Sequence, residues 1–178
     1  MLTGINDTEL MGDNVRDKLK RCGTGVRIYP LAKLAYPHVI ELDDHCSIRD
    51  FAFIFAGRGV KIGQYSDIQP HVVIWGGGET IIGNRVSVGP GTVLLSAVYS
   101  HAEGMKMVDG LPDGSSAALY GKLVIEDDVY IGANCTLMPN ITVGEGAVIG
   151  AASFVNKDVE PWGIFVGSPA KKIGERKR

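Results

Sequence analysis

Aliphatic residues recur at every sixth position through the C-terminal part of the chain. From residue 125 onward the sequence falls into six blocks of six residues, and each block begins with isoleucine, leucine or valine. The fifth residue of most blocks is small or β-branched. The block heads are Ile125, Ile131, Leu137, Val143, Ile149 and Val155. A register held over six blocks indicates a repeat architecture in which every block is one structural unit.

The same register runs through the N-terminal half, with regular interruptions. Blocks begin at Cys22, Ile28 and Leu34, and eight residues then separate Leu34 from the next block head, Leu42. This pattern of three blocks and a longer step repeats twice, and the fourth step lengthens to 31 residues before Ile125. Three blocks therefore make one coil, and the coils cover residues 22–41, 42–61, 62–81, 82–124, 125–142 and 143–160.

Coils with three similar sides predict an all-β fold, a three-sided parallel solenoid. Each block supplies a short strand and a tight corner, and its aliphatic head stacks inward on the equivalent residue one coil away, about 4.8 Å along the axis. Glycine often follows the head, where a corner needs positive φ or a close approach of the backbone. These glycines are Gly63, Gly83, Gly89, Gly132, Gly144 and Gly150. The alternative is a two-sheet sandwich, but sandwiches do not hold a six-residue register for this long.

The N-terminal segment has a different pattern. Asn6 followed by Glu9 resembles a capping box, and apolar residues then recur at four-residue spacing. Those apolar residues are Met11, Val15 and Leu19. We expect a helix over 6–21 that plugs the first coil, because solenoids need their ends covered.

The C-terminal segment is short and basic. Ser168 and Pro169 resemble an N-cap and N1 pair, so we expect a short helix over 169–176. The predicted organisation is then an N-terminal helical cap over 1–21, a solenoid domain over 22–166 and a C-terminal basic helix or tail over 167–178.

Every irregularity in the register falls on the third side of a coil. The two-residue insertions lie around 35–38, 55–58 and 75–78, and the long insertion, residues 98–118, leaves from the same side. Long loops on rigid scaffolds are where function usually resides. We expect this loop, which has His101 at its root, to project outward and form one wall of a cleft.

Composition and charge narrow the possible functions. The chain has 178 residues, 24 of them glycine, and a net charge of −2, so no basic field attracts nucleic acid. No apolar run is long enough for a membrane span, and the N-terminus lacks the pattern of a signal peptide, so we expect a cytoplasmic protein. The cysteines form no CxxC pair; Cys46 and Cys135 sit at the small fifth position and Cys22 heads a block. We assign these three a structural role.

The hexapeptide run, the loop histidine and the tail VNKDVEPWGIFVGSPAKKI at 155–173 resemble the hexapeptide-repeat acyltransferases. The resemblance is closest to the galactoside and maltose O-acetyltransferases and to sugar acetyltransferases of surface-polysaccharide pathways, including lipopolysaccharide biosynthesis. It implies a left-handed parallel β-helix, a homotrimer with active sites between neighbouring subunits, acetyl-CoA as the donor, and a loop histidine as general base.

His101 occupies the place of that base. A neutral imidazole within hydrogen-bond reach can take the proton of a sugar hydroxyl or amine as it attacks the thioester carbonyl. The tetrahedral oxyanion then needs donors, for which backbone N–H groups of the solenoid wall are available. Glu103 either orients the imidazole or is a solvated loop charge, and the sequence leaves both interpretations open.

Two residues one coil before the loop are candidates for acceptor binding. His71 is in the block that begins at Ile68, and Gln69 matches a family position usually held by asparagine, a difference that points to a different sugar. We interpret His38 and His45 as surface residues. No metal is expected, because the zinc site of the γ-class carbonic anhydrases, which share the solenoid, needs a second histidine near the first, and His101 has none.

The resemblance also implies where coenzyme A binds. Small residues let the pantetheine arm approach the backbone, and a pair of residues after the last coil and a basic residue beyond the Gly-x-Pro motif complete the site. The matching residues are Gly89, Ala133, Ala151, Asn156, Lys157 and Lys171. The asparagine departs from the family's threonine but still offers a donor and an acceptor.

The sequence therefore favours an acetyl-CoA-dependent transferase that acts on a free or nucleotide-linked sugar. Whether oxygen or nitrogen accepts the acyl group stays open, as do the sugar and the length of the acyl chain, which the loop at 98–118 is expected to set. Two alternatives remain: a drug-inactivating acetyltransferase of the streptogramin or chloramphenicol type, and a non-catalytic solenoid scaffold subunit.

Overall fold

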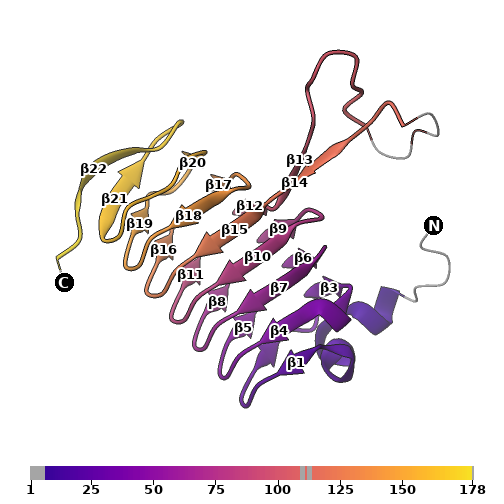
Figure 1. Cartoon of the computed structure of the whole chain (residues 1–178). Helices are drawn as coiled ribbons and strands as arrows, with labels where there is room; N and C mark the ends of the chain where they lie inside the picture. The colour runs from indigo at the N-terminus through magenta and orange to yellow at the C-terminus, as the bar shows by residue number, and fades with distance from the viewer. Residues whose placement is uncertain (1–6, 109–110, 112–113, 178) are drawn as a thin grey trace.

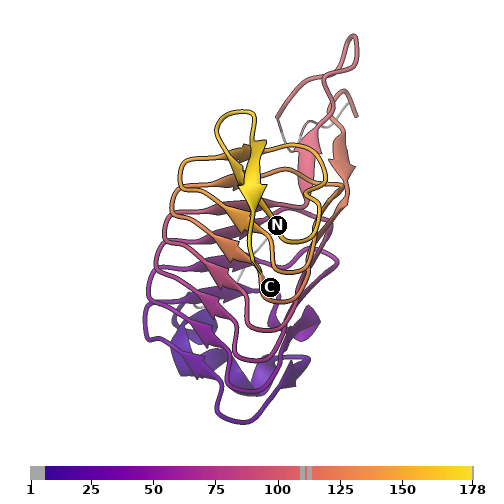
Figure 2. The same cartoon turned by 90° about the vertical axis from the view of Figure 1, so that its left-hand side faces the viewer.

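The chain folds into a three-sided solenoid of short strands, which confirms the predicted fold class (Figures 1 and 2). The computed structural model describes residues 7–108, 111 and 114–177. In these residues, three sheets surround one hydrophobic core, and their strands run parallel except for the last. A two-stranded hairpin projects from one corner (Figure 1).

Each sheet takes one strand from every coil. Sheet one contains β1 (Arg21–Cys22), β4 (Ile40–Leu42), β7 (Gly59–Ile62), β10 (Glu79–Ile82), β15 (Lys122–Ile125) and β18 (Ile141–Val143). Sheet two contains β2 (Arg27–Ile28), β5 (Ser47–Ile48), β8 (Asp67–Ile68), β11 (Ser87–Val88), β16 (Tyr130–Ile131), β19 (Val148–Ile149), β21 (Gly163–Val166) and β22 (Lys171–Glu175). Sheet three contains β3 (Lys33–Ala35), β6 (Phe53–Phe55), β9 (Val73–Trp75), β12 (Val93–Leu95), β17 (Thr136–Leu137) and β20 (Phe154–Val155).

The block heads build the core, as the register predicts. In sheet three, Leu34 pairs with Ile54, Ile54 with Ile74, Ile74 with Leu94, and Leu94 with Leu137. All five side chains are fully buried. Each side chain stacks on the equivalent aliphatic side chain of the next coil, so the core is a set of continuous stacks along the axis. A short strand of two or three residues is stable here because both its neighbours in the sheet satisfy its backbone hydrogen bonds.

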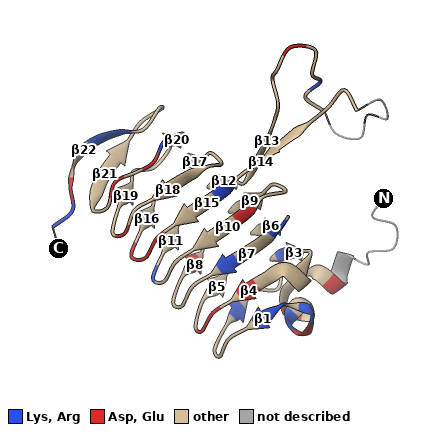
Figure 3. Cartoon of the chain, in the orientation of Figure 1, with Lys and Arg blue, Asp and Glu red and all other residues tan. Residues whose placement is uncertain are grey.

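The outer faces of the sheets differ in chemistry. Sheet one carries ion pairs between successive coils, such as Lys20–Glu41 at 2.6 Å and Lys122–Glu79 at 3.0 Å (Figure 3). Sheet three instead presents apolar side chains outward, and its Trp75 is 46% exposed. Its outward residues on three neighbouring strands are Phe53, Phe55, Val73, Trp75, Val93 and Leu95. An exposed cluster of apolar side chains of this kind marks an interaction surface.

The glycines that follow the block heads allow the backbones of successive coils to approach closely. The residue with positive φ at these corners is the one two positions after the glycine. A Cβ on Gly63 would lie 2.5 Å from the carbonyl carbon of Gly83 on the next coil. Gly63 itself does not have positive φ, whereas Tyr65 does, at 58°. The ring of Tyr65 stacks on that of His45 one coil below, with centroids 4.9 Å apart. Such stacking offsets part of the cost of the left-handed conformation in a non-glycine residue.

At the equivalent corner of the next two coils, charged side chains pair with each other. The guanidinium of Arg85 donates two hydrogen bonds of 2.7 Å to Asp128 on the next coil. These bonds lower the pKa of Asp128 from its usual value. Arg85 and Asp128 both have positive φ. Pairing between corner side chains therefore accompanies the strained corner conformation in these coils as well.

The N-terminal segment is helical but is not the single helix expected over 6–21. It forms two 3-10 helices, η1 (Asp7–Leu10) and η2 (Gly12–Lys18), and Asn6 lies outside the described residues. Met11, which is extended, separates them, and Gly12, at φ 55°, begins η2. Val15 is fully buried in the core, so the segment covers the first coil. A third 3-10 turn, η3 (Pro37–Val39), occupies a corner of the first coil.

The predicted C-terminal helix over 169–176 is wrong, because these residues form the antiparallel strand β22. Lys171 and Lys172 pair with Val166 and Phe165 of β21. Strand β21 is the last parallel strand of sheet two, so its outer edge would otherwise expose unpaired backbone groups. A short isolated helix has little stability in water. Pairing with the edge of β21 gives the backbone groups of the tail hydrogen-bond partners, so the tail forms a strand.

The cysteines are free, and two of them are buried. Burial raises the pKa of the Cys46 thiol to about 12 and also raises that of Cys135. Because the thiolate is the reactive form, we expect only Cys22 to react with an aromatic disulfide reagent at pH 8 in the native protein, and all three after unfolding in guanidinium. Absorbance of the released thiolate measures the count, and two or three rapidly reacting native thiols would contradict the buried placement.

Candidate active site

The long insertion is an antiparallel hairpin between β12 and β15. It begins with β13 (Ala97–Tyr99) and ends with β14 (Ala118–Tyr120), and Tyr99 pairs with Ala118. The ladder extends one step further, because the Ser100 N–H donates to the Ala117 carbonyl at 2.8 Å. His101 follows directly and is exposed. His101 thus lies just beyond the paired stem of the hairpin. The hairpin itself projects away from the solenoid body (Figures 1 and 2).

The other candidate residues, except Lys171 at the start of β22, lie on two edges of sheet three. The loop edge comprises the connections from sheet three to sheet one, residues 36–39, 56–58, 76–78, 96–121, 138–140 and 156–158. The opposite edge comprises the connections from sheet two to sheet three, residues 29–32, 49–52, 69–72, 89–92, 132–135 and 150–153. The strands between them have two or three residues, so about 10 Å of sheet separates the two edges within a chain.

Gly76, Gly77 and Gly78 let the base of the hairpin pack closely against the solenoid. The ring of Tyr120 lies against Gly77, and a Cβ on Gly78 would overlap the carbonyl oxygens of Gly121 and Ser96. Residues 76–78 are one of the insertions that the register reveals, and the structure gives the physical reason for their composition. Any side chain at Gly78 would displace the base of the hairpin, and His101 with it.

An apolar pocket of about 230 Å³, hereafter the aromatic pocket, lies where the hairpin meets sheet three. It is lined by Phe55, Trp75, Gly76, Gly77, Ala97, Val98, Tyr99, Ala118 and Tyr120. The rings of Phe55 and Trp75 are 4.7 Å apart, and the guanidinium of Arg58 sits 5.0 Å from the centre of the Tyr120 ring. Sequence analysis missed this pocket. Its signal was the pair of aromatic residues, Phe55 and Trp75, at equivalent positions of successive coils.

The loop residues do not form a preassembled dyad. Glu103 is exposed, like His101, and no hydrogen bond joins their side chains in the described part of the chain. The one side-chain bond at the turn runs from the Ala102 N–H to Ser100 Oγ, at 3.3 Å. In the single chain, Glu103 therefore does not make the hydrogen bond through which it would orient the His101 imidazole.

The predicted acceptor residues lie on the opposite edge. Gln69 donates to Ser87 Oγ at 3.2 Å, and the exposed ring of His71 stacks on Phe51 with centroids 4.9 Å apart. The structure does not bring them to His101, which is on the loop edge. Within one chain, sheet three stands between the two sets.

The small residues assigned to coenzyme A also gather on the opposite edge. A Cβ on Gly89 would lie 2.7 Å from the backbone nitrogen of Ala133 on the next coil. Ala151 occupies the equivalent corner one coil further, and its nitrogen lies 2.5 Å from the position of a Cβ on Gly132. The three residues thus form a column with little side-chain cover, along which a ligand can reach the backbone.

The three polar residues assigned to coenzyme A lie at the C-terminal end. Asn156 and Lys157 follow β20 on the loop edge, and Lys171 begins β22. All three are exposed. A small pocket of about 120 Å³ beside them is lined by Asn156, Lys157 and Ala170, among others. The C-terminal strand therefore brings Lys171 to the same end of the solenoid as Lys157, although the sequence predicted a helix there.

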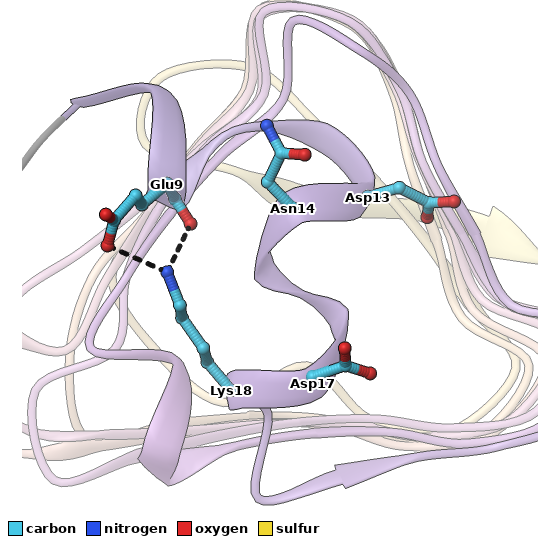
Figure 4. A pocket seen from close by; sticks show the side chains of 5 residues that line it. All are labelled: Glu9, Asp13, Asn14, Asp17 and Lys18. Atoms are coloured by element: carbon cyan, nitrogen blue, oxygen red, sulfur yellow. Dashed lines mark hydrogen bonds and ion pairs between the residues drawn. The ribbon is translucent and has the colours of Figure 1, made fainter.

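A further cavity, of about 630 Å³, lies at the N-terminal cap and is lined by Glu9, Asp13, Asn14, Asp17 and Lys18 (Figure 4). Lys18 Nζ binds both a carboxylate oxygen of Glu9, at 3.0 Å, and the Glu9 carbonyl, at 3.3 Å. The cavity has no apolar wall and is remote from the hairpin (Figure 1). Across the described residues, no group of three or more histidine, cysteine or acidic side chains is arranged to hold a metal ion.

Comparisons with known proteins agree with this architecture. Residues 122–157 match the family model of the bacterial transferase hexapeptide (six repeats). An aspartate-to-alanine variant of AntD, an N-acyltransferase from Bacillus cereus in complex with dTDP and coenzyme A, is 30% identical in sequence. It superposes with a TM-score of 0.80 over 92% of this chain and 88% of its own. The chain belongs to the hexapeptide-repeat acyltransferases. Its β-helix has the left-handed sense of that family.

Two curated relatives differ in how much of the chain they match. The dTDP-4-amino-4,6-dideoxy-D-glucose acyltransferase of Escherichia coli is 28% identical over 160 residues, which are 89% of this chain and 83% of the relative. A chloramphenicol acetyltransferase of Klebsiella aerogenes is 55% identical, but over 56 residues, 32% of this chain. The chain spans only 27% to 41% of the length of six curated relatives that it matches over 56 or 95 residues.

The comparisons leave the individual site residues as predictions. Within the described residues, no helix has the length and hydrophobicity needed to cross a bilayer.

Proposed function

We propose that the protein transfers an acyl group from coenzyme A to the amino group of a nucleotide-linked sugar. The observation that carries the proposal is the match, over 92% of the chain, to an N-acyltransferase that holds both dTDP and coenzyme A. The curated relative matched over 89% of the chain is named for a dTDP-amino-sugar acceptor. Both relatives favour nitrogen over oxygen as the accepting atom.

We assign the general base to His101. The amine nitrogen attacks the thioester carbonyl carbon, a carbon–nitrogen bond forms and the carbon–sulfur bond breaks. His101 removes a proton from the nitrogen during the attack and returns it to the departing thiolate, so the products are an amide and free coenzyme A. Its exposed position beyond the hairpin stem leaves both imidazole nitrogens accessible to a bound substrate.

We propose that the working site is shared between copies of the chain in a homotrimer. His101 lies on the loop edge, while Gln69 and His71 lie on the opposite edge, with sheet three between them. A cyclic arrangement in which the loop edge of one copy meets the opposite edge of the next would unite them. The apolar outer face of sheet three supports such packing because it lies between the two edges, and its outward residues nearest the opposite edge are Phe53, Val73 and Val93.

We place coenzyme A along the opposite edge and the C-terminal end. The column of Gly89, Ala133 and Ala151 suits the pantetheine arm, since its backbone groups can bond to the amides of the arm. Asn156 can bond to the same arm as donor and acceptor. Lys157 and Lys171 are exposed cations that suit the nucleotide phosphates.

Gln69, His71 and Glu103 are proposed to contact the acceptor. The product is proposed to enter surface-polysaccharide synthesis, and the reaction to take place in the cytoplasm.

Antibiotic acetylation is the second candidate, favoured by the 55% identity to a chloramphenicol acetyltransferase. That identity covers only 32% of the chain, so it supports the shared repeat more than a shared acceptor.

Product analysis tests the proposal. The protein is incubated with acetyl-CoA and, separately, dTDP-4-amino-4,6-dideoxyglucose, the corresponding 4-hydroxyl sugar nucleotide, or chloramphenicol. We expect release of free coenzyme A and a product heavier by one acetyl group with the amino sugar, and at least tenfold slower reaction with the other two, in about the range that one lost polar contact discriminates. Preferred acetylation of chloramphenicol, or no reaction with any acceptor, would refute the proposal.

A further inference from the structure

The aromatic pocket lies at the stem of the hairpin that carries His101. Tyr99, in the pocket wall, is the last residue of β13 and lies two residues before His101, and alternation along the strand puts Ala97 and Tyr99 on one face of the hairpin. Ala118, paired with Tyr99, and Tyr120, paired with Ala97, lie on that face as well. The pocket therefore begins at the stem of the hairpin, directly below the proposed base.

The walls of the pocket select an uncharged occupant. None of the described residues that line it is charged, and the nearby guanidinium of Arg58 is already placed over the Tyr120 ring. A diphosphate inside the pocket would lose its hydration, and no charged side chain among the lining residues would replace it. A sugar ring has several hydroxyls to satisfy, whereas the lining side chains offer two phenol hydroxyls and one indole N–H. A hydrocarbon chain has no polar group to satisfy and gains from leaving water.

The size of the pocket exceeds what an acetyl group needs. Its volume is about 230 Å³. At roughly 30 Å³ for a water-sized group, that leaves room for about seven such groups, and the methyl of an acetyl group fills one. A chain of four to six carbons uses the remaining space and contacts the rings of Phe55, Trp75 and Tyr120.

We propose that the aromatic pocket binds the hydrocarbon chain of the acyl donor and makes the enzyme selective for acyl groups longer than acetyl. This inference rests on the proposed function. With His101 at the thioester carbonyl, the chain attached to that carbonyl runs down the hairpin face into the pocket. The reaction is unchanged: the carbonyl carbon exchanges its bond to sulfur for a bond to the amine nitrogen, and the chain takes no part.

Chain-length selectivity tests the inference. The values of kcat/KM for acetyl-, butyryl- and hexanoyl-CoA are measured with the same amino-sugar acceptor. We expect butyryl-CoA to exceed acetyl-CoA by at least about tenfold, the factor that burial of two more methylene groups provides. Ala118→Leu, which fills the pocket, is expected to lower the butyryl-to-acetyl ratio at least about tenfold. Ala97→Val, a smaller filling, should lower it less and serves if the leucine variant does not fold.

Leu119→Ala is the matched control, because Leu119 is adjacent in the chain but points from the opposite face of β14. Its ratio should equal that of the unaltered enzyme. Equal use of all three donors, or an unchanged ratio in both filling variants, would overturn the inference while acetyl-CoA turnover kept the proposed function intact. A change of oligomeric state in both filling variants by sedimentation would also overturn it, since the pocket would then hold a side chain of a neighbouring copy. No turnover with any donor would refute the proposed function itself.

Discussion

Replacing His101 with alanine is expected to lower turnover at least about a hundredfold, the usual contribution of a general base. The substituted enzyme should fold normally, because the imidazole is exposed and lies beyond the paired stem of the hairpin. The loss should appear mainly in kcat, since His101 acts on the proton of the attacking amine and does not hold the donor. Release of free coenzyme A at saturating donor and acceptor measures the effect.

His38→Ala is the matched control for that substitution. His38 is an exposed histidine on the same loop edge, in the 3-10 turn Pro37–Val39 of the first coil. It lies three coils from the hairpin, so its removal should leave kcat within about twofold, in keeping with surface substitutions remote from a site. Near-normal turnover in His101→Ala would remove the base from the mechanism.

Mixing of two inactive variants separates a site shared between copies from a site within one chain. His101→Ala retains the opposite edge and His71→Ala retains the loop edge. If neighbouring copies share each site, co-expression of the two variants should restore about a quarter of the wild-type activity, because one pairing in four joins two intact edges. A site completed within one chain would show no recovery above the sum of the separate variants.

The solenoid was predictable because its signal is repeated at every coil. Heads such as Leu34, Ile54 and Ile74 stack on each other in the structure, so an inward position in one coil implies an inward position in the next. The insertions were also visible as breaks in the register, and they correctly located the corner from which the hairpin leaves. A residue that departs from the repeat at one position does not change the predicted fold when six coils carry the same pattern.

The ends were less predictable because they have no repeated neighbour to test them against. Ser168 and Pro169 suggested a helix start, but the decisive factor was the unpaired edge of β21, which is a property of the assembled sheet. Likewise the four-residue spacing of Met11, Val15 and Leu19 identified the buried side of the cap, where Val15 lies in the core, but not the 3-10 geometry.

The site was predictable only in part. The register break identified His101 as a loop residue and placed Gln69 and His71 one coil before the loop, but only the structure shows that these two lie on the opposite edge of sheet three. The aromatic pocket required three dimensions, because it combines side chains of sheet three with Tyr99 and Tyr120, which only the pairing of β13 with β14 brings together. The coil repeat links Phe55 with Trp75, but no pattern in the sequence links either of them with residues of the hairpin.

Gly63→Ala tests the packing of successive coils and is expected to lower the free energy of unfolding by about 1–3 kcal/mol, the cost of overpacking. The added Cβ would lie 2.5 Å from the carbonyl carbon and the carbonyl oxygen of Gly83, which are backbone atoms that cannot move without shifting the coil. Because Gly63 does not have positive φ, alanine suffers no backbone strain there, and the contact alone causes the loss.

Calorimetry measures the effect as a fall in Tm, by about 2–4 °C for each kcal/mol in a chain of this size. Gln64→Ala is the matched control: Gln64 is the next residue of the same corner and exposed, and its bond to Asn84 Oδ1 comes from the backbone N–H and is retained. That variant should stay within about 0.5 kcal/mol of the unaltered protein. If Gly63→Ala were no less stable than Gln64→Ala, the spacing of the coils would not be limited by backbone contact at this corner, and the glycines that follow the block heads would need another explanation.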